Sequence, residues 1–150
     1  VVLSDRPVAS SGSLRVFSHP LGDYPVSLYG VPALARQFSG GFPANLTGAP
    51  LMLPTRTNAL RGKLEQWLEA NELRPQIVGE FEDSALMDTF GRQGMGLFPA
   101  LSMLEAEIAD QLGAQRVGEL DGVLEQVFAI SGERRIRHPG VEAMLSAAAR

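Results

Sequence analysis

The chain has 150 residues, of which 45% are hydrophobic, and its formal net charge at pH 7 is −4. This length fits one ordinary domain or two small lobes, and the apolar content is sufficient for a hydrophobic core. No apolar run is long enough to span a bilayer, there is no cysteine for a disulfide or a zinc–thiolate site, and the basic residues form no cluster suited to a phosphate backbone, so this stretch is not expected to bind DNA.

The sequence begins inside an apolar run. Residues 1–3 read as a strand with no polar lead-in, which predicts that the chain is a fragment of a longer protein. The run ends at Ser4-Asp5-Arg6-Pro7, because a proline forces the residue before it out of the helical region. Asp5 and Arg6 are therefore expected at the tip of a polar loop.

The next segment is predicted to contain two extended pieces and a short helix. The extended pieces, residues 14–16 and 25–29, are divided by His19-Pro20-Leu21-Gly22, which is a candidate hinge. The helix is expected over residues 31–38, and Gly40-Gly41-Phe42-Pro43 ends it with residues that cannot continue a helix.

A strand, a polar loop and the clearest helix of the chain follow. Residues 50–53 form the strand, and Pro54-Thr55-Arg56-Thr57 form the loop. One face of the helix is apolar at the spacing i, i+4, i+7 and i+8, and this face consists of Leu60, Leu64, Trp67 and Leu68.

The segment from residue 80 to residue 100 begins with an acidic strand end and a helix start. The strand 77–81 leads to Asp83 and Ser84, either of which can cap a helix. Leu86 and Phe90 then fall one helical turn apart, which is typical of an apolar helix face.

A glycine-marked turn completes this segment. Gly94 and Gly96 end the helix, and Pro99 stops a short strand that contains Leu97 and Phe98. The segment is thus a strand, helix, strand unit, which predicts a tight crossover in a parallel sheet. In such sheets ligands meet the chain where strands end and helices begin.

The last third of the sequence is predicted to hold two helices and two strands. Ser102 and Glu105 fit a capping box before a helix with apolar residues every four positions, and a glycine ends this helix. Residues 115–120 and 124–131 read as strands, and a final helix is expected from Pro139.

The alternation of strands and helices predicts an α/β fold with a parallel central sheet. Two segments, residues 19–29 and 124–135, are candidates for crossings between two lobes. The corresponding division places a remnant of the first lobe and the first crossing in residues 1–22, a second lobe in residues 23–125, and the second crossing with a return helix in residues 126–150.

Two patterns invite a ligand-binding interpretation that their context weakens. The pair Gly94 and Gly96 does not fit a dinucleotide fingerprint, because a helix precedes it and a proline follows. Glu80, Glu82 and Asp83 are weak candidates for oxygen ligands of a metal ion or for an acid/base pair. Glu80 and Glu82 share one side of a strand, so they are more simply its solvent-facing side.

No catalytic residue is predicted. Ser84 has no G-x-S-x-G context, and His19 and His138 both precede a proline in an expected turn. No cofactor is expected either.

The helix starts are better candidates for a binding site. The hydroxyls of Thr55 and Thr57, the N–H groups of a helix start and the guanidinium of Arg56 together suit an anion or a carboxylate, although plain capping is the simpler alternative. Asp83-Ser84 supplies a second helix start after a second strand of the same sheet, and Asp5-Arg6 could face both from the other lobe.

An ordered series of short segments stands at the spacing of a known family. The segments are Leu3-Ser4-Asp5, Val31-Pro32-Ala33-Leu34, Ser84 through Met87, Gly94-Met95-Gly96-Leu97-Phe98-Pro99 and His138-Pro139. Over the whole chain they resemble the effector-binding domain of LysR-type transcriptional regulators. The stretches GEFEDSALM, GLFPA and ISGERR are most similar to the subgroup that activates sodium/proton antiporter genes.

This resemblance implies a periplasmic-binding-protein type 2 fold, in which two α/β lobes are joined by two crossing strands and a small molecule or ion is bound between them. The first lobe would be incomplete here. The implied effector-facing wall consists of Pro54, Thr55, Arg56, Thr57, Asp83, Ser84, Phe98 and Pro99, with Asp5 and Arg6 near the hinge.

The resemblance also implies a bacterial cytoplasmic regulator that forms homo-oligomers, does not contact membranes and binds DNA only through an N-terminal winged helix-turn-helix absent from this sequence. For the antiporter subgroup it implies a response to sodium or alkaline stress. One alternative is a solute-binding protein of a transport system, which shares the fold and would carry an export leader. Another is a small α/β hydrolase or transferase, which would need a nucleophile or metal constellation.

Overall fold

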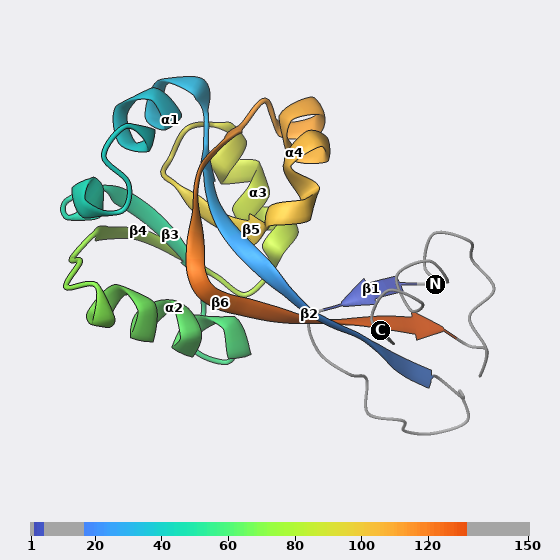
Figure 1. Cartoon of the computed structure of the whole chain (residues 1–150). Coiled ribbons are helices and arrows are strands. Elements are labelled where there is room, and N and C mark those ends of the chain that lie inside the picture. The colour runs from blue at the N-terminus through green and yellow to red at the C-terminus, as the bar shows by residue number, and fades with distance from the viewer. Residues whose placement is uncertain (1, 5–16, 132–150) are drawn as a thin grey trace. The chain divides into compact units, whose positions relative to one another are not determined.

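The computed structural model describes residues 2–4 and 17–131. The chain divides into two compact units, one made of residues 1–24 and 125–150 and the other of residues 25–124. Strands β2 (Phe17–Gly30) and β6 (Gln115–Ser131) run through both units, and β1 (Val2–Ser4) pairs antiparallel with β6 in the first (Figure 1). The helix expected from Pro139 lies outside the described residues.

The second unit alternates strands and helices, as the sequence predicted. Between β2 and β6 come α1 (Pro32–Ser39), β3 (Pro50–Pro54), α2 (Ala59–Ala70), β4 (Gln76–Phe81), α3 (Ser84–Arg92), β5 (Phe98–Leu101) and α4 (Glu105–Leu112), with 3-10 turns at Ala44–Leu46 and Ser102–Leu104. Proline near the start of α1 and asparagine at the N-cap of α2 are the sequence features that begin these two helices.

The strand pairing is mixed, and the prediction of a parallel sheet was only partly correct. β3 and β4 are parallel, and Leu97 forms a parallel bridge to Leu51 of β3 just before β5 begins. β5 itself pairs antiparallel with β2. After β4 the chain therefore passes through α3 and returns on the other side of β3, where Leu97 lies beside that strand. The strand β5, which follows Leu97, has the long strand β2 as its antiparallel partner.

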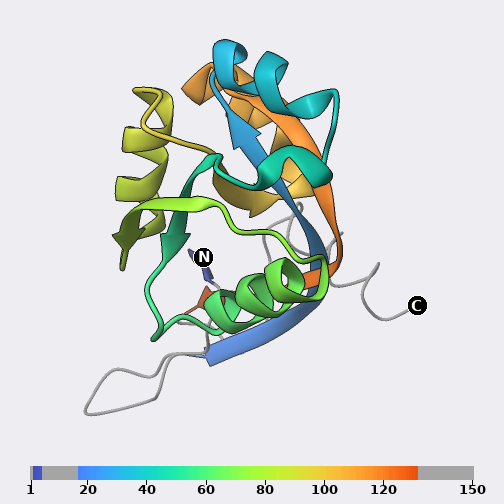
Figure 2. The same ribbon diagram turned by 90° about the vertical axis from the view of Figure 1, so that its left-hand side faces the viewer.

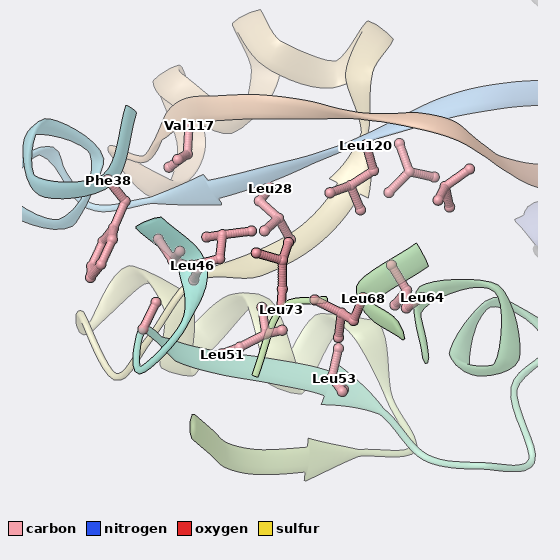
Figure 3. Packing of buried hydrophobic residues seen from close by; sticks show 14 of the residues in the cluster. Leu28, Phe38, Leu46, Leu51, Leu53, Leu64, Leu68, Leu73, Val117 and Leu120 are labelled. Carbon is pink, nitrogen blue, oxygen red and sulfur yellow. The ribbon is translucent and has the colours of Figure 1, made fainter. Parts of the chain in front are cut away.

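Two apolar clusters fill the second unit, one on each side of β3. Leu51 and Leu53 belong to the cluster that includes the buried leucines of α2 (Figure 3), whereas Met52 belongs to the cluster that includes Met87 of α3. Because successive side chains of a strand point to opposite faces, α2 and α3 cover opposite faces of the β3–β4 pair.

Two predicted breaks in the strands are absent. The candidate hinge His19-Pro20-Leu21-Gly22 lies inside β2, where Leu21 is fully buried, and the two strands predicted in the last third form the single strand β6. Gly22 and Gly122 have positive φ values of 130° and 83°. A glycine with a positive φ can bend a strand without ending it. The turn signals in the sequence therefore wrongly predicted strand boundaries at these positions.

The predicted strand stop at Pro99 was also wrong. Pro99 is the second residue of β5 and lies opposite Leu28 of β2. β5 is the end strand in the order β1-β6-β2-β5, and an edge strand tolerates the missing N–H of a proline.

Helices α3 and α4 differ from expectation in their faces and starts. On α3, Leu86 and Phe90 are 50% and 37% exposed, and the buried residues are Met87 and Gly91. A Cβ on Gly91 would lie 2.5 Å from the Phe98 ring, so the glycine lets this helix approach β5 closely. The predicted capping box before α4 is not formed, because the Ser102 hydroxyl lies 2.6 Å from the Ser27 hydroxyl.

Candidate functional site

The carboxyl ends of β3 and β4 lie next to each other. Pro54, the last residue of β3, is opposite Phe81, the last residue of β4, and the Thr55 N–H donates to the Phe81 carbonyl over 3.0 Å. Figure 2 shows the two arrowheads side by side. The loops that lead into α2 and α3 therefore begin at one edge of the strand pair, where open α/β sheets bind ligands.

The loop after β3 presents polar groups at the start of α2. The hydroxyls of Thr55 and Thr57 lie 3.0 Å apart, and Arg56 and Thr57 are exposed. Asn58 is the N-cap, and its Oδ1 accepts a hydrogen bond from the Leu60 N–H over 2.8 Å. This arrangement gives an anionic or polar ligand hydroxyl donors, a cation and a helix N-terminus within a short segment.

The loop after β4 presents the start of α3. Asp83 is the N-cap, and its Oδ1 accepts a hydrogen bond from the Ala85 N–H over 2.7 Å. Asp83, Ser84 and Glu82 are all exposed. Of the two residues predicted to cap this helix, Asp83 does so, and the Ser84 side chain is available at the first helical position.

The acidic residues of this segment have separate surroundings. The Glu80 carboxylate accepts a charged hydrogen bond of 3.4 Å from Arg61, while Asp83 caps its own helix. Within residues 2–4 and 17–131, no group of three or more acidic or histidine side chains is placed to hold a metal ion.

Arg61 is the residue at this edge that the sequence analysis did not identify. It lies in the first turn of α2 and is only 5% exposed, and its Nη1 donates to the Pro54 carbonyl over 2.8 Å. A signal was present in the sequence, because Arg61 precedes Leu64 and Leu68 at the spacing i, i+3 and i+7. It is thus a cation within the apolar stripe of the helix.

Phe98 and Pro99 are buried, as is Pro54, whereas Arg56, Thr57, Asp83 and Ser84 of the predicted wall are exposed. The Phe98 side chain is fully buried, its ring stacked with Tyr29 at a centroid distance of 6.0 Å, and Pro99 is also buried. The Tyr29 hydroxyl donates to the Leu101 carbonyl over 2.7 Å, and burial is the main cause that raises the pKa of Tyr29 to about 12. Asp5 and Arg6 lie outside the described residues.

The carboxyl group of Asp88 on α3 is expected to make the stability of the fold depend on pH. Burial, and secondly the Asp83 carboxylate, raise the pKa of Asp88 from its ordinary 3.8 to about 6. The pKa of Asp88 is higher in the folded chain than in the unfolded chain. Its contribution to the stability of the fold is therefore complete below the unfolded pKa and is lost as the pH rises through the folded pKa. We expect Asp88→Asn to raise the free energy of unfolding by about 1 kcal/mol at pH 7.5, after allowance for solvent access to a half-buried group, and to change it little at pH 4. Denaturant titrations at both pH values check this, and an equal effect at the two would contradict it.

The described residues also form a depression to which neither of these two loops contributes a lining residue. This depression of about 410 Å³ is lined by Glu105, Ala109, Ala114, Gln115 and Arg116, at the junction of α4 and β6. None of the helices in this part of the chain has the length and apolar character needed to cross a bilayer.

Comparison with known proteins identifies relatives over nearly the whole chain. The sequence matches the family described as LysR substrate binding domain over residues 2–150. The transcriptional activator proteins NhaR of Escherichia coli (strain K12) and of Shigella flexneri are each 31% identical to it over 142 residues, which is 95% of this chain and 46% of either relative. The chain thus spans about half the length of these curated relatives.

Solved structures confirm the predicted fold class. The effector domain of the transcriptional regulator AmpR of Pseudomonas aeruginosa has a TM-score of 0.58 at 21% identity, covering 92% of this chain and 68% of that one. The effector binding domain of QuiR in complex with shikimate has a TM-score of 0.57 at 12% identity, covering 93% of this chain and 66% of that one. At such identities the likeness concerns the fold alone. The family match extends over residues 2–150, and the chain therefore belongs to the LysR substrate binding domain family.

Proposed function

We propose that the chain is the effector-sensing domain of a LysR-type bacterial transcriptional regulator and that it binds a small polar molecule or ion at the edge where β3 and β4 end. The observation that carries the proposal is the placement of two helix starts, Asn58 and Asp83, at the adjacent ends of two parallel strands. This is the position at which α/β sheets present backbone N–H groups to ligands.

The polar groups of the loop after β3 favour a ligand with an anionic end. Thr55, Arg56 and Thr57 can donate hydrogen bonds to a carboxylate, and the exposed hydroxyl of Ser84 at the start of α3 adds a donor or acceptor. Phe98 and Pro99, because they are buried, would act behind this surface by supporting it. Asp5 and Arg6 stay a prediction.

The proposed mechanism is a shift between conformations. An effector that binds one arrangement of the regulator more tightly than another changes the populations of the two, by no more than the difference in its affinities. A coupling free energy of about 1–3 kcal/mol is ordinary for such switches. In this proposal the domain has no enzymatic activity, because sensing requires binding alone.

The similarity to the transcriptional activator NhaR, together with the resemblance of GEFEDSALM, GLFPA and ISGERR to activators of sodium/proton antiporter genes, extends the proposal to partners and targets. We propose a cytoplasmic homo-oligomer whose DNA contacts come from a part of the regulator outside these 150 residues, with sodium/proton antiporter genes as the targets. The net charge of −4 supports the absence of DNA contacts in this stretch. The alternative of a solute-binding protein is not favoured, since the chain matches the regulator family along its length.

Ligand-dependent unfolding tests this function. We expect shikimate or another small carboxylate from a panel to raise the unfolding temperature, since a ligand at 100 times its dissociation constant stabilises by about 2.7 kcal/mol. Sodium chloride against potassium chloride tests an ionic effector in the same assay.

A matched pair of variants locates the effect. Arg56→Gln is expected to reduce the rise caused by the carboxylate, whereas Arg74→Gln, a change of the same kind at an exposed arginine before β4, is expected to leave it unchanged. The absence of a rise with every carboxylate and with sodium would contradict the proposal.

A further inference from the structure

Arg61 is a buried cation with three acceptors. Its side chain is 6% exposed, its Nε donates to Glu65 Oε1 over 2.8 Å, and its Nη2 donates to Glu80 Oε1 over 3.4 Å. Its Nη1 donates to the Pro54 carbonyl over 2.8 Å. Charged side chains are rarely this buried unless they are paired, so these contacts account for the position of the guanidinium.

The three acceptors belong to three consecutive elements. Pro54 is the last residue of β3, Glu65 lies one turn further along α2, and Glu80 precedes the last residue of β4. The planar guanidinium of Arg61 thus contacts β3, α2 and β4. It does so at the carboxyl end of the two strands, where the loop of Thr55, Arg56 and Thr57 begins. A guanidinium directs its donors along fixed lines, so it fixes the Pro54 carbonyl relative to the helix and to the neighbouring strand.

The loop between Pro54 and the helix also has contacts of its own, among them the one between the Thr55 and Thr57 hydroxyls over 3.0 Å. The Thr55 N–H donates to the Phe81 carbonyl over 3.0 Å, and the Asn58 N–H donates to the Thr55 carbonyl over 3.0 Å. These bonds hold the two ends of the loop, while Arg56 and Thr57 between them are exposed. The orientation of the exposed groups therefore depends in part on how firmly Pro54 is held.

We propose that Arg61 is a positioning residue for ligand binding: it does not touch the ligand but holds the loop of Thr55, Arg56 and Thr57 in its binding geometry. This rests on the proposed function of the loop. A loop held in place before binding loses less conformational freedom when the ligand arrives, which favours affinity. The same contact explains Glu80, whose carboxylate serves as the β4 anchor of Arg61.

Amide hydrogen exchange of the 150-residue chain tests the proposal. Arg61→Lys keeps one donor within reach of a carbonyl but cannot reproduce the fork. We expect the Thr55 and Asn58 amides to exchange about tenfold faster in this variant, relative to the Leu64 and Leu68 amides of α2, because the loop opens without global unfolding.

A second variant and a control keep the test independent of the stability of Arg61→Lys. Glu80→Gln removes only the charge of the β4 anchor, and we expect about threefold faster exchange at Thr55, since a half-exposed ion pair contributes little. Arg74→Lys at an exposed position is expected to change neither amide. The proposal would be overturned if the exchange rates of the Thr55 and Leu64 amides rose by the same factor, or if the rate at Thr55 changed in neither variant. Either result would mean that Arg61 stabilises the fold without positioning the loop.

The two proposals fail in different ways. If no carboxylate or cation stabilises the unmodified chain, the proposed effector function fails, whatever the exchange rates show. If a carboxylate binds but the Thr55 amide in Arg61→Lys exchanges as in the unmodified chain, the function stands and the positioning role is overturned.

Discussion

Replacing Phe98 with alanine is expected to lower the free energy of unfolding by about 3–5 kcal/mol, because a large ring is removed from a closed core. Phe98 is fully buried, stacks on Tyr29 and belongs to the cluster that also contains Met52 and Met87. Its ring also lies against Gly91, where a Cβ would meet it at 2.5 Å. The surroundings come from a strand, a helix and a neighbouring strand, and they cannot collapse easily into the space left behind.

The matched control is the same substitution at an exposed ring. Phe90 is 37% exposed and pairs with Phe81 at a centroid distance of 5.6 Å, so Phe90→Ala is expected to cost about 1 kcal/mol. Denaturant titrations of both variants measure the difference. Similar losses for the two would show that Phe98 is not the central packing residue of this cluster.

Replacing Arg61 with methionine is expected to cost about 2 kcal/mol, the second largest effect. Methionine occupies a similar volume but gives the buried Pro54 carbonyl no donor, and an unpaired buried carbonyl loses its hydration without compensation. Glu65 and Glu80 are about half exposed and can return to water, and relief from burying the cation offsets part of the loss.

Arg116→Met provides the comparison for this second variant. Arg116 Nε forms an ion pair with Glu105 Oε1 at 3.1 Å, but the Arg116 side chain is 43% exposed, and we expect a cost of about 0–1 kcal/mol that shrinks with added salt. Unfolding of both variants at low and high salt separates a buried carbonyl contact from a surface ion pair. A loss for Arg61→Met as small and salt-sensitive as that for Arg116→Met would contradict this account.

The local elements could be predicted because their signals are local. The apolar stripe of α2, the proline that begins α1 and the Asp83 cap of α3 all act within one or two helical turns, and the structure forms each of them where the sequence indicated. The two loops of the candidate site could be placed together because parallel strands end at one edge.

The pairing and depth of segments could not be predicted in the same way. His19-Pro20-Leu21-Gly22 is a turn pattern, but a buried Leu21 and a ladder partner keep β2 continuous, and that partner lies far along the sequence. Pro99 was read as a strand end because the edge position of β5 cannot be seen in a short segment. Tertiary contacts outweigh local propensity in both cases.

Burial also explains where the predicted site and the structure differ. Phe98 was expected at the wall, yet its neighbours Tyr29 and Gly91 enclose it from elements that lie on either side in the sequence. Arg61 was overlooked because a charged residue in a helix is usually exposed. Its position in the leucine stripe was the only local sign, and its partners Pro54 and Glu80 become neighbours only in the fold.

The central claim is that the edge formed by the ends of β3 and β4 binds a small effector. An NMR titration of the ¹⁵N-labelled chain with shikimate and the other carboxylates of the panel tests it most directly, because every backbone amide reports its own surroundings. We predict that the largest changes in amide chemical shift occur at Thr55, Arg56, Thr57 and Ser84. Largest changes at the depression between Glu105 and Arg116, or no changes with any carboxylate or with sodium chloride in the same titration, would contradict the claim.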